Sequence, residues 1–124
     1  MSFSFIGTDC DLKVDIGFIV DSSGSISRRN FARLKAFLQA IIQKFEIGPE
    51  AARVAIIAYS SRVQVVLKFN DPANLNKDEV NNKIARIPHQ RGLTFIDKAL
   101  FTAEREVFTK EGGIRTNVPQ VIFL

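Results

Sequence analysis

The chain has 124 residues, of which 46% are hydrophobic and 24% charged, and this is enough for one soluble domain with its own core. Lysine and arginine outnumber aspartate and glutamate by 17 to 13, but the basic residues are scattered, with no run that would follow a nucleic-acid backbone. No apolar stretch approaches the roughly 20 residues that cross a bilayer, and the first residues lack a signal-peptide pattern. Composition therefore predicts neither nucleic-acid binding nor membrane insertion.

The first half of the chain predicts a strand, a helix and a hairpin. Residues 12–20 alternate and then become continuously apolar, which is typical of a strand buried on both faces of a parallel sheet. Residues 27–45 place apolar side chains at every third or fourth position, which indicates an amphipathic helix. Residues 53–59 predict a second buried strand and residues 62–69 an alternating one. Because these two strands are so close in sequence, we expect an antiparallel hairpin.

The second half predicts two more helices and a last strand. Helices are expected at residues 76–87 and 94–108, with a loop at 88–93 between them, a glycine pair at 112–113 that ends the second helix, and a strand at 118–124. This order predicts an α/β, doubly wound (Rossmann-like) fold, in which helices cover both faces of a mostly parallel sheet with one antiparallel edge strand. Since no helix follows the last strand, we expect a C-terminally incomplete domain with an uncovered sheet edge.

A polar cluster follows the first strand. Asp21 offers a carboxylate, Ser23 and Ser25 offer hydroxyls at alternate positions, and Gly24 relieves crowding between them. In open α/β sheets, ligands bind beyond the carboxyl ends of strands, where this cluster lies. Such hard oxygen ligands suit Mg²⁺, Ca²⁺ or Mn²⁺, whereas Zn²⁺ would favour a Cys/His cluster, which the sequence lacks. The plainer alternative is a turn and helix cap, in which Ser25 or Ser27 accepts hydrogen bonds from free amides.

The segment Asp21-Ser22-Ser23-Gly24-Ser25 resembles the metal-ion-dependent adhesion site, Asp-x-Ser-x-Ser, of von Willebrand factor type A domains. The resemblance covers most of the chain. Residues 53–60 are similar to the second strand of that family, residues 92–100 to its second metal-binding loop, and residues 118–124 to the strand that leads into the third. On this basis residues 1–9 are an N-terminal extension, and residues 10–124 are the N-terminal part of such a domain.

The resemblance also implies a set of metal ligands. Ser23 and Ser25 would coordinate the cation through their hydroxyls, Asp21 mostly through water, and Thr94 directly or through water. The remaining aspartate of the family site would follow Leu124 and is absent from the sequence. With one carboxylate where the family has two, we expect weak binding of a divalent cation, about millimolar, with Mg²⁺ ahead of Mn²⁺ or Ca²⁺.

The function that the resemblance implies is adhesion in the extracellular space. The cation would bind an acidic group of a protein ligand, such as a collagen or another matrix or cell-surface protein. Extracellular members often carry a cysteine before the first strand, where Cys10 stands, and its partner follows the last helix. The sequence shows no nucleophile with a base, no phosphate-binding glycine loop and no catalytic carboxylate pair, so we expect no enzyme. His89 is expected to be a surface residue without a role. Asp15 is expected to be an outer-shell charge or a paired charge at the far end of the first strand.

Two alternatives belong to other classes. One is a structural module of the matrix that self-associates through the sheet edge at residues 121–124, with the metal incidental. The other is a metal-dependent phosphoryl-transfer or hydrolytic enzyme with Asp21 as the nucleophile. The enzyme would need a second aspartate two positions later, where Ser23 stands.

Overall fold

A four-stranded sheet forms the centre of the computed structural model, which describes residues 13–124. The strands are β1 (Asp15–Asp21), β2 (Arg53–Tyr59), β3 (Val63–Leu67) and β4 (Gln120–Phe123), and they lie in the order β3-β2-β1-β4. Strand β1 is parallel to both β2 and β4, whereas β3 is antiparallel to β2. The mostly parallel sheet with one antiparallel edge strand is therefore confirmed.

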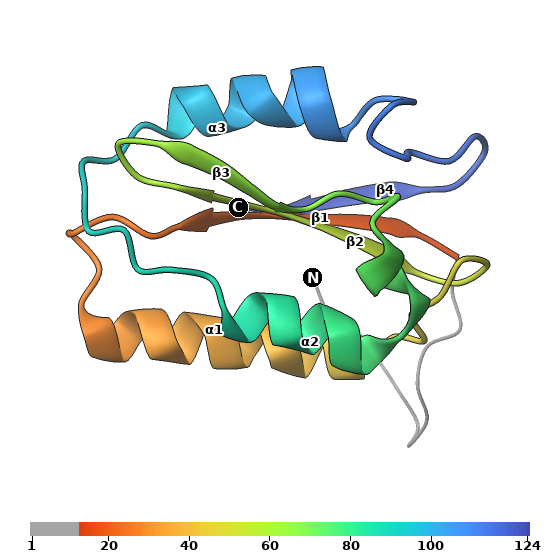
Figure 1. Ribbon diagram of the computed structural model, residues 1–124, viewed down its shortest axis with the longest axis horizontal. Coiled ribbons are helices and arrows are strands. Elements are labelled where there is room, and N and C mark those ends of the chain that lie inside the picture. Colours follow the sequence, from red (N-terminus) through yellow and green to blue (C-terminus); the bar gives the residue numbers. More distant parts are fainter. Residues whose placement is uncertain (1–12) are drawn as a thin grey trace.

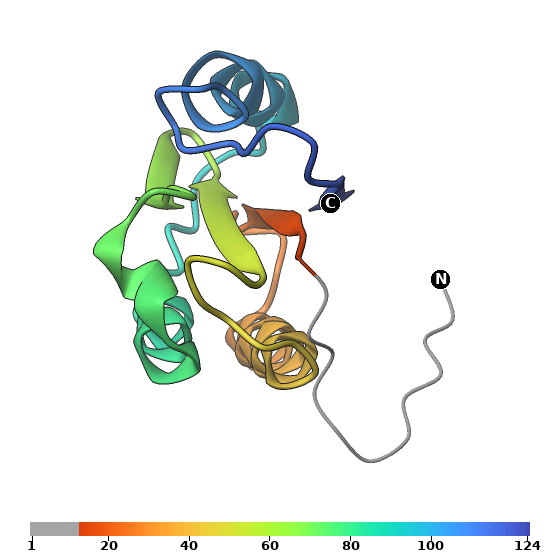
Figure 2. The ribbon, with the colours of Figure 1, turned by 90° about the vertical axis from the view of Figure 1, so that its right-hand side faces the viewer.

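Helices cover both faces of this sheet (Figures 1 and 2). The helices α1 (Arg28–Gln43) and α2 (Lys77–Ala85) lie together on one face, and α3 (Ile96–Thr102) lies on the other. A short 3-10 helix, η1 (Pro72–Leu75), precedes α2, and a π-helical turn, η2 (Ala103–Val107), continues α3. No helix in this part of the chain is long and apolar enough to cross a membrane.

The two central strands are buried on both faces, as their continuous apolar runs predict. Alternate side chains of β1 and β2, including Phe18 and Ile56, pack against α1 and α2. The intervening ones, including Ile19 and Ile57, pack with Ala99 of α3 on the opposite face. A strand with a helical layer on each side exposes neither set of side chains, and this explains why the sequence shows no lasting alternation there.

Side-chain caps fix the starts of α1 and α2. Ser27 Oγ accepts a hydrogen bond from the amide of Asn30 at 3.1 Å, and Asn76 Oδ1 accepts one from the amide of Glu79 at 2.9 Å. The part of the turn-and-cap alternative that concerned Ser27 is thus correct. The hydroxyl of Ser25 takes no part in this cap and is available for another role.

The predicted helix at residues 94–108 is wrong at both of its ends. It begins at Ile96, because the amide of Phe95 donates to the carbonyl of Ser60 at 3.1 Å and holds the preceding loop against β2. Its second half is π-helical and ends at Val107, ahead of the glycine pair, with the amide of Phe108 donating to the carbonyl of Ala103 at 2.8 Å. Thr94 consequently lies in a loop and not in the helix.

Candidate metal centre

Strand β1 delivers the serine loop, residues 21–25, to the carboxyl end of the sheet. Asp21 is the last residue of β1 and pairs in register with Tyr59, the last residue of β2. The amide and the hydroxyl of the buried Ser22 both donate to the carbonyl of Tyr59, at 2.8 and 3.1 Å. Ser22 therefore anchors the loop to the sheet, and its hydroxyl is already in use.

The hydroxyls of Ser23 and Ser25 lie together, with their Oγ atoms 2.8 Å apart. In an octahedral Mg²⁺ site with bonds of 2.0–2.1 Å, adjacent ligand oxygens stand about 2.9 Å apart, so the two hydroxyls already have the spacing of neighbouring ligands. Asp21 Oδ1 accepts a hydrogen bond from the amide of Ser23 at 2.8 Å, and within the described chain no hydrogen bond engages Oδ2. The three predicted residues thus form one oxygen-rich cluster that fits a hard cation.

The adjoining loop, residues 88–95, connects α2 to α3. It runs alongside the serine loop, at the left of Figure 1. The amide of Arg91 donates to the carbonyl of Ser22, and the amide of Gly24 donates to the carbonyl of Gly92, both at 2.9 Å. A Cβ atom on Gly24 would lie 2.6 Å from the carbonyl oxygen of Arg91, which only a glycine avoids. The two loops are therefore joined backbone to backbone.

Thr94 is placed by its neighbours and not by its own side chain. The amide of Leu93 donates to Ser61 Oγ at 2.8 Å, and the amide of Phe95 donates to the carbonyl of Ser60 at 3.1 Å. Thr94 stands between these anchors and is exposed, and none of the hydrogen bonds of the described residues joins its hydroxyl to the serine loop. The structure brings its loop to the cluster but leaves the threonine side chain outside the hydroxyl pair.

His89, which we expected to be a surface residue without a role, contacts both α1 and the serine loop. Its ring is half-buried and stacks on Phe31 of α1, with centroids 4.6 Å apart and an interplanar angle of 11°. Its Nε2 atom lies 3.1 Å from the carbonyl oxygen of Ser23. One signal was present in the sequence, because the loop 88–93 that contains His89 adjoins residues 92–100, which the resemblance assigns to the metal. The contact itself joins residues far apart in the chain.

The negative charge of Asp21 is felt at Tyr59. Burial raises the pKa of the Tyr59 hydroxyl above its ordinary value, and the charge of Asp21 raises it further by a smaller amount. Within residues 13–124, no three side chains among histidine, cysteine, aspartate and glutamate gather at one point. A cation at the serine loop would therefore depend on the two hydroxyls and on the carboxylate of Asp21.

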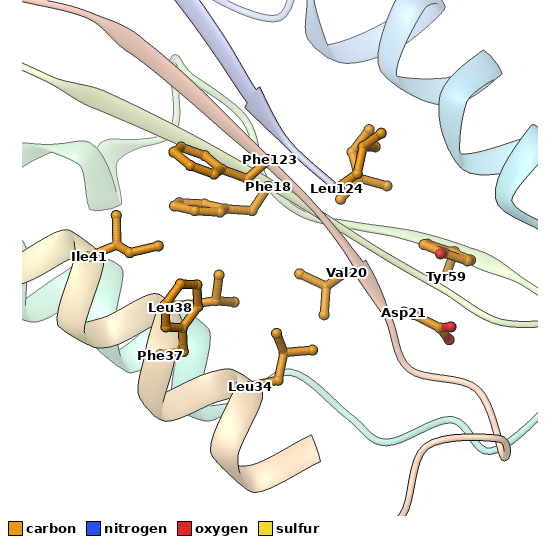
Figure 3. Close-up of a pocket in the computed structure, with 11 residues that line it drawn as sticks. Phe18, Val20, Asp21, Leu34, Phe37, Leu38, Ile41, Tyr59, Phe123 and Leu124 are labelled. Atoms are coloured by element: carbon orange, nitrogen blue, oxygen red, sulfur yellow. The ribbon is translucent and has the colours of Figure 1, made fainter. Parts of the chain in front are cut away.

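An apolar pocket of about 190 Å³ opens beside the serine loop, between α1 and the β1–β4 edge. Figure 3 shows Asp21 and Tyr59 at one end of it, while Phe18 and Phe123 stack with centroids 5.3 Å apart. Phe37, which its helical spacing predicts to face the core, lines this pocket and is 60% exposed. The lining is mostly hydrocarbon, so the pocket is chemically distinct from the hydroxyl cluster.

Comparison with known proteins gives consistent relatives. The family model for the von Willebrand factor type A domain matches residues 15–124. Human matrilin-3 is 34% identical over 114 residues, which cover 90% of this chain and 23% of matrilin-3. The mouse collagen alpha-6(VI) chain is 31% identical over 114 residues, which cover 92% of this chain and 5% of the collagen chain. The chain thus spans less than a quarter of either relative.

One solved structure similar to this chain contains a bound metal. Proximal thread matrix protein 1 from the mussel byssus, with a zinc-occupied MIDAS motif, superposes with a TM-score of 0.79 at 28% identity. The match covers 93% of this chain and 28% of the byssus protein. A protein similar to this chain therefore holds a divalent cation in its MIDAS motif.

Proposed function

Because the chain belongs to the von Willebrand factor type A domain family, we propose that it is an adhesion module that binds a divalent cation at Asp21, Ser23, Ser25 and Thr94. Through this cation it binds an acidic group of a protein ligand. One observation carries the proposal: the Ser23 and Ser25 hydroxyls stand 2.8 Å apart beside the carboxylate of Asp21.

Each residue has a distinct task. Ser23 and Ser25 donate their hydroxyl oxygens to the cation, Asp21 holds the loop through the Ser23 amide and faces the cation through water, and Thr94 joins from the adjoining loop. The bound cation supplies a positive centre with an open position that a carboxylate can fill. Because the residues contribute only one carboxylate, the affinity is weak, about millimolar, and Mg²⁺ is the expected cation.

The module spans residues 10–124, with residues 1–9 as an extension, and the family match to residues 15–124 supports this division. Relatives that include a collagen chain and a byssus matrix protein support an extracellular location and a matrix protein as partner. They also support a binding role over an enzymatic one. The alternative of a metal-dependent enzyme with Asp21 as its nucleophile would need a second carboxylate two positions later. The sequence has the hydroxyl of Ser23 there.

A titration with Mg²⁺ and with Mn²⁺, followed by calorimetry, tests the cation site in the chain as it is. The double change Ser23→Ala, Ser25→Ala should abolish binding, because it removes both hydroxyl ligands. Ser27→Ala is the matched control, since Ser27 caps α1 and lies outside the cluster. Binding by the double variant as tight as that of the unchanged chain would show that the cation sits elsewhere.

Self-association is the second candidate function, and β4 favours it. This strand lies at the edge of the sheet, and Ile122 and Leu124 are 50% and 78% exposed. Sedimentation over a range of concentrations separates the two candidates. A monomer at all concentrations speaks against assembly, whereas assembly that persists without a cation speaks against metal-dependent adhesion.

A further inference from the structure

We propose that His89 is a positioning residue of the cation site, which it serves by holding the peptide of Ser23 from the adjoining loop. The inference rests on the proposed cation-binding function of the serine loop. It concerns a side chain that would not touch the cation. Its action is on the backbone that directs the Ser23 hydroxyl.

The chemistry of the contact fixes its direction. Ser23 contributes a carbonyl oxygen, which can only accept, so Nε2 of His89, at 3.1 Å, must be the donor. In the neutral ring the proton then resides on Nε2. The other nitrogen, Nδ1, is buried and has no hydrogen-bond partner in the described chain. This agrees with a ring that forms its hydrogen bond through Nε2 alone.

Contacts with α1 hold the imidazole ring of His89, so that the ring can in turn position the Ser23 peptide. Its face stacks on Phe31, a side chain of α1 that is only 4% exposed. Lys35, one turn further along α1, donates through Nζ to the carbonyls of Ala85 at 2.8 Å and Ile87 at 3.3 Å. Those carbonyls belong to the segment that leads into His89. Helix α1 thus fixes both the imidazole and the backbone just before it.

The hydrogen bond from His89 completes a row across the two loops. The row also contains the Arg91 amide bonded to the Ser22 carbonyl and the Gly24 amide bonded to the Gly92 carbonyl. The three bonds therefore hold two successive peptide units of the serine loop, the second of them at both its carbonyl and its amide. The bond from His89 is the one made by a side chain. Because Ser23 Oγ points at Ser25 Oγ, a rotation of the Ser23 peptide would separate the two ligands.

Two substitutions separate the two properties of the imidazole, its aromatic ring and its hydrogen-bond donor. His89→Phe keeps an aromatic ring on Phe31 but removes the donor, whereas His89→Gln keeps an N–H at the reach of Nε2 but removes the ring. With Mn²⁺ as the probe, we expect His89→Phe to weaken binding about tenfold, the lower end of the loss on removing a partner of a metal ligand. His89→Gln should bind within about twofold of the unchanged chain. Thermal unfolding of both variants is measured alongside.

A structural role would behave differently. If both variants lose affinity to the same extent, if His89→Gln loses more, or if neither loses any, the hydrogen bond does not position the site and the inference is wrong. Failure of the unchanged chain to bind Mn²⁺ refutes the proposed function itself. The ring tautomer, read from the ¹⁵N NMR spectrum of the unchanged chain, needs neither a variant nor a metal. A proton on Nε2 supports the inference, and a proton on Nδ1 overturns it.

Discussion

Asp15 and Arg115 form a buried ion pair at the end of β1 opposite the serine loop. Arg115 Nη2 lies 2.7 Å from Asp15 Oδ1, the amide of Arg115 donates to Oδ2 at 2.9 Å, and the Asp15 side chain is fully buried. The same nitrogen, Nη2, donates to the carbonyl of Val14 at 3.0 Å, and Nε donates to Asp15 Oδ1 at 2.9 Å. The expectation of a paired charge at Asp15 is confirmed, and the pair ties the segment before β4 to the first strand.

Arg115→Ala should lower the free energy of unfolding by about 3–5 kcal/mol, because it leaves the carboxylate of Asp15 buried without a counter-charge. Urea denaturation measures the change. The control is Lys13→Ala, which removes the exposed pair between Lys13 and Glu50, whose side chains are 46% and 86% exposed. We expect this control to unfold like the unchanged chain. Equal effects of the two changes would mean that burial of Asp15 is irrelevant to the pair.

Tyr59 offers a direct reading of the electrostatics at the serine loop, because it is the single tyrosine of a chain that has no tryptophan. Its folded pKa is raised above 10.0 by burial and, secondarily, by Asp21. The near-ultraviolet absorbance of tyrosinate should therefore appear above pH 10 in the folded protein, and Asp21→Asn should shift it back toward that value. A folded midpoint at or below the ordinary value would contradict the structure.

The same shift sets the sign of a stability change. The folded state keeps the Tyr59 proton more tightly than the unfolded state, so the stabilisation is fully present below the unfolded pKa. It is lost as pH rises from that value through the higher folded pKa. The free energy of unfolding should fall over this alkaline window, and the fall should be smaller in Asp21→Asn because one of the two causes is removed.

The sequence predicted most of the fold because its signals are local. Apolar runs mark β1 and β2, helical spacing marks α1, and the closeness of β2 and β3 demands a hairpin. The start of α3 could not be predicted in the same way, because the amide of Phe95 is held by Ser60 of a distant segment. Helical periodicity reports which face is buried and says little about which residue begins the first turn.

The candidate site divides along the same line. Asp21, Ser23 and Ser25 lie within five positions of one another, and a short pattern was enough to group them. His89 comes close to them only when the chain folds. A lone histidine in a polar loop does not indicate that its ring stacks on Phe31. Likewise, the exposure of Phe37 depends on what neighbours α1 on the β4 side of the sheet, which helical spacing does not encode.

Gly24→Ala should separate the two loops. A Cβ atom there would meet the carbonyl oxygen of Arg91 at 2.6 Å, and since the obstacle is backbone it cannot rotate away. We expect a loss of about 1–3 kcal/mol in the free energy of unfolding, the usual cost of overpacking, together with weaker Mn²⁺ binding. Gly48→Ala is the matched control, because a Cβ atom at Gly48 meets nothing within 4 Å. If Gly24→Ala leaves both measurements unchanged, the loops are not in the contact described.

Asn74 completes the sheet where β3 stops. Strand β3 pairs with β2 as far as the match of Leu67 with Ile56, and beyond it the side chain of Asn74 takes the place of a strand. Its Oδ1 accepts from the amide of Val54 at 2.7 Å, and its Nδ2 donates to the carbonyl of Val54 at 2.9 Å. Asn74 is 4% exposed, so water cannot replace these bonds without opening the structure.

Asn74→Ala should lower the free energy of unfolding by about 2–4 kcal/mol, because it leaves a buried donor and a buried acceptor of Val54 unpaired. Urea denaturation gives the magnitude, and hydrogen exchange gives the mechanism, since the Val54 amide should lose protection. Asn82→Ala on the exposed side of α2 is the control and should stay within about 0.5 kcal/mol of the unchanged chain. Full protection of the Val54 amide in Asn74→Ala would show that another group satisfies it, and that β2 does not depend on a side chain to extend its pairing.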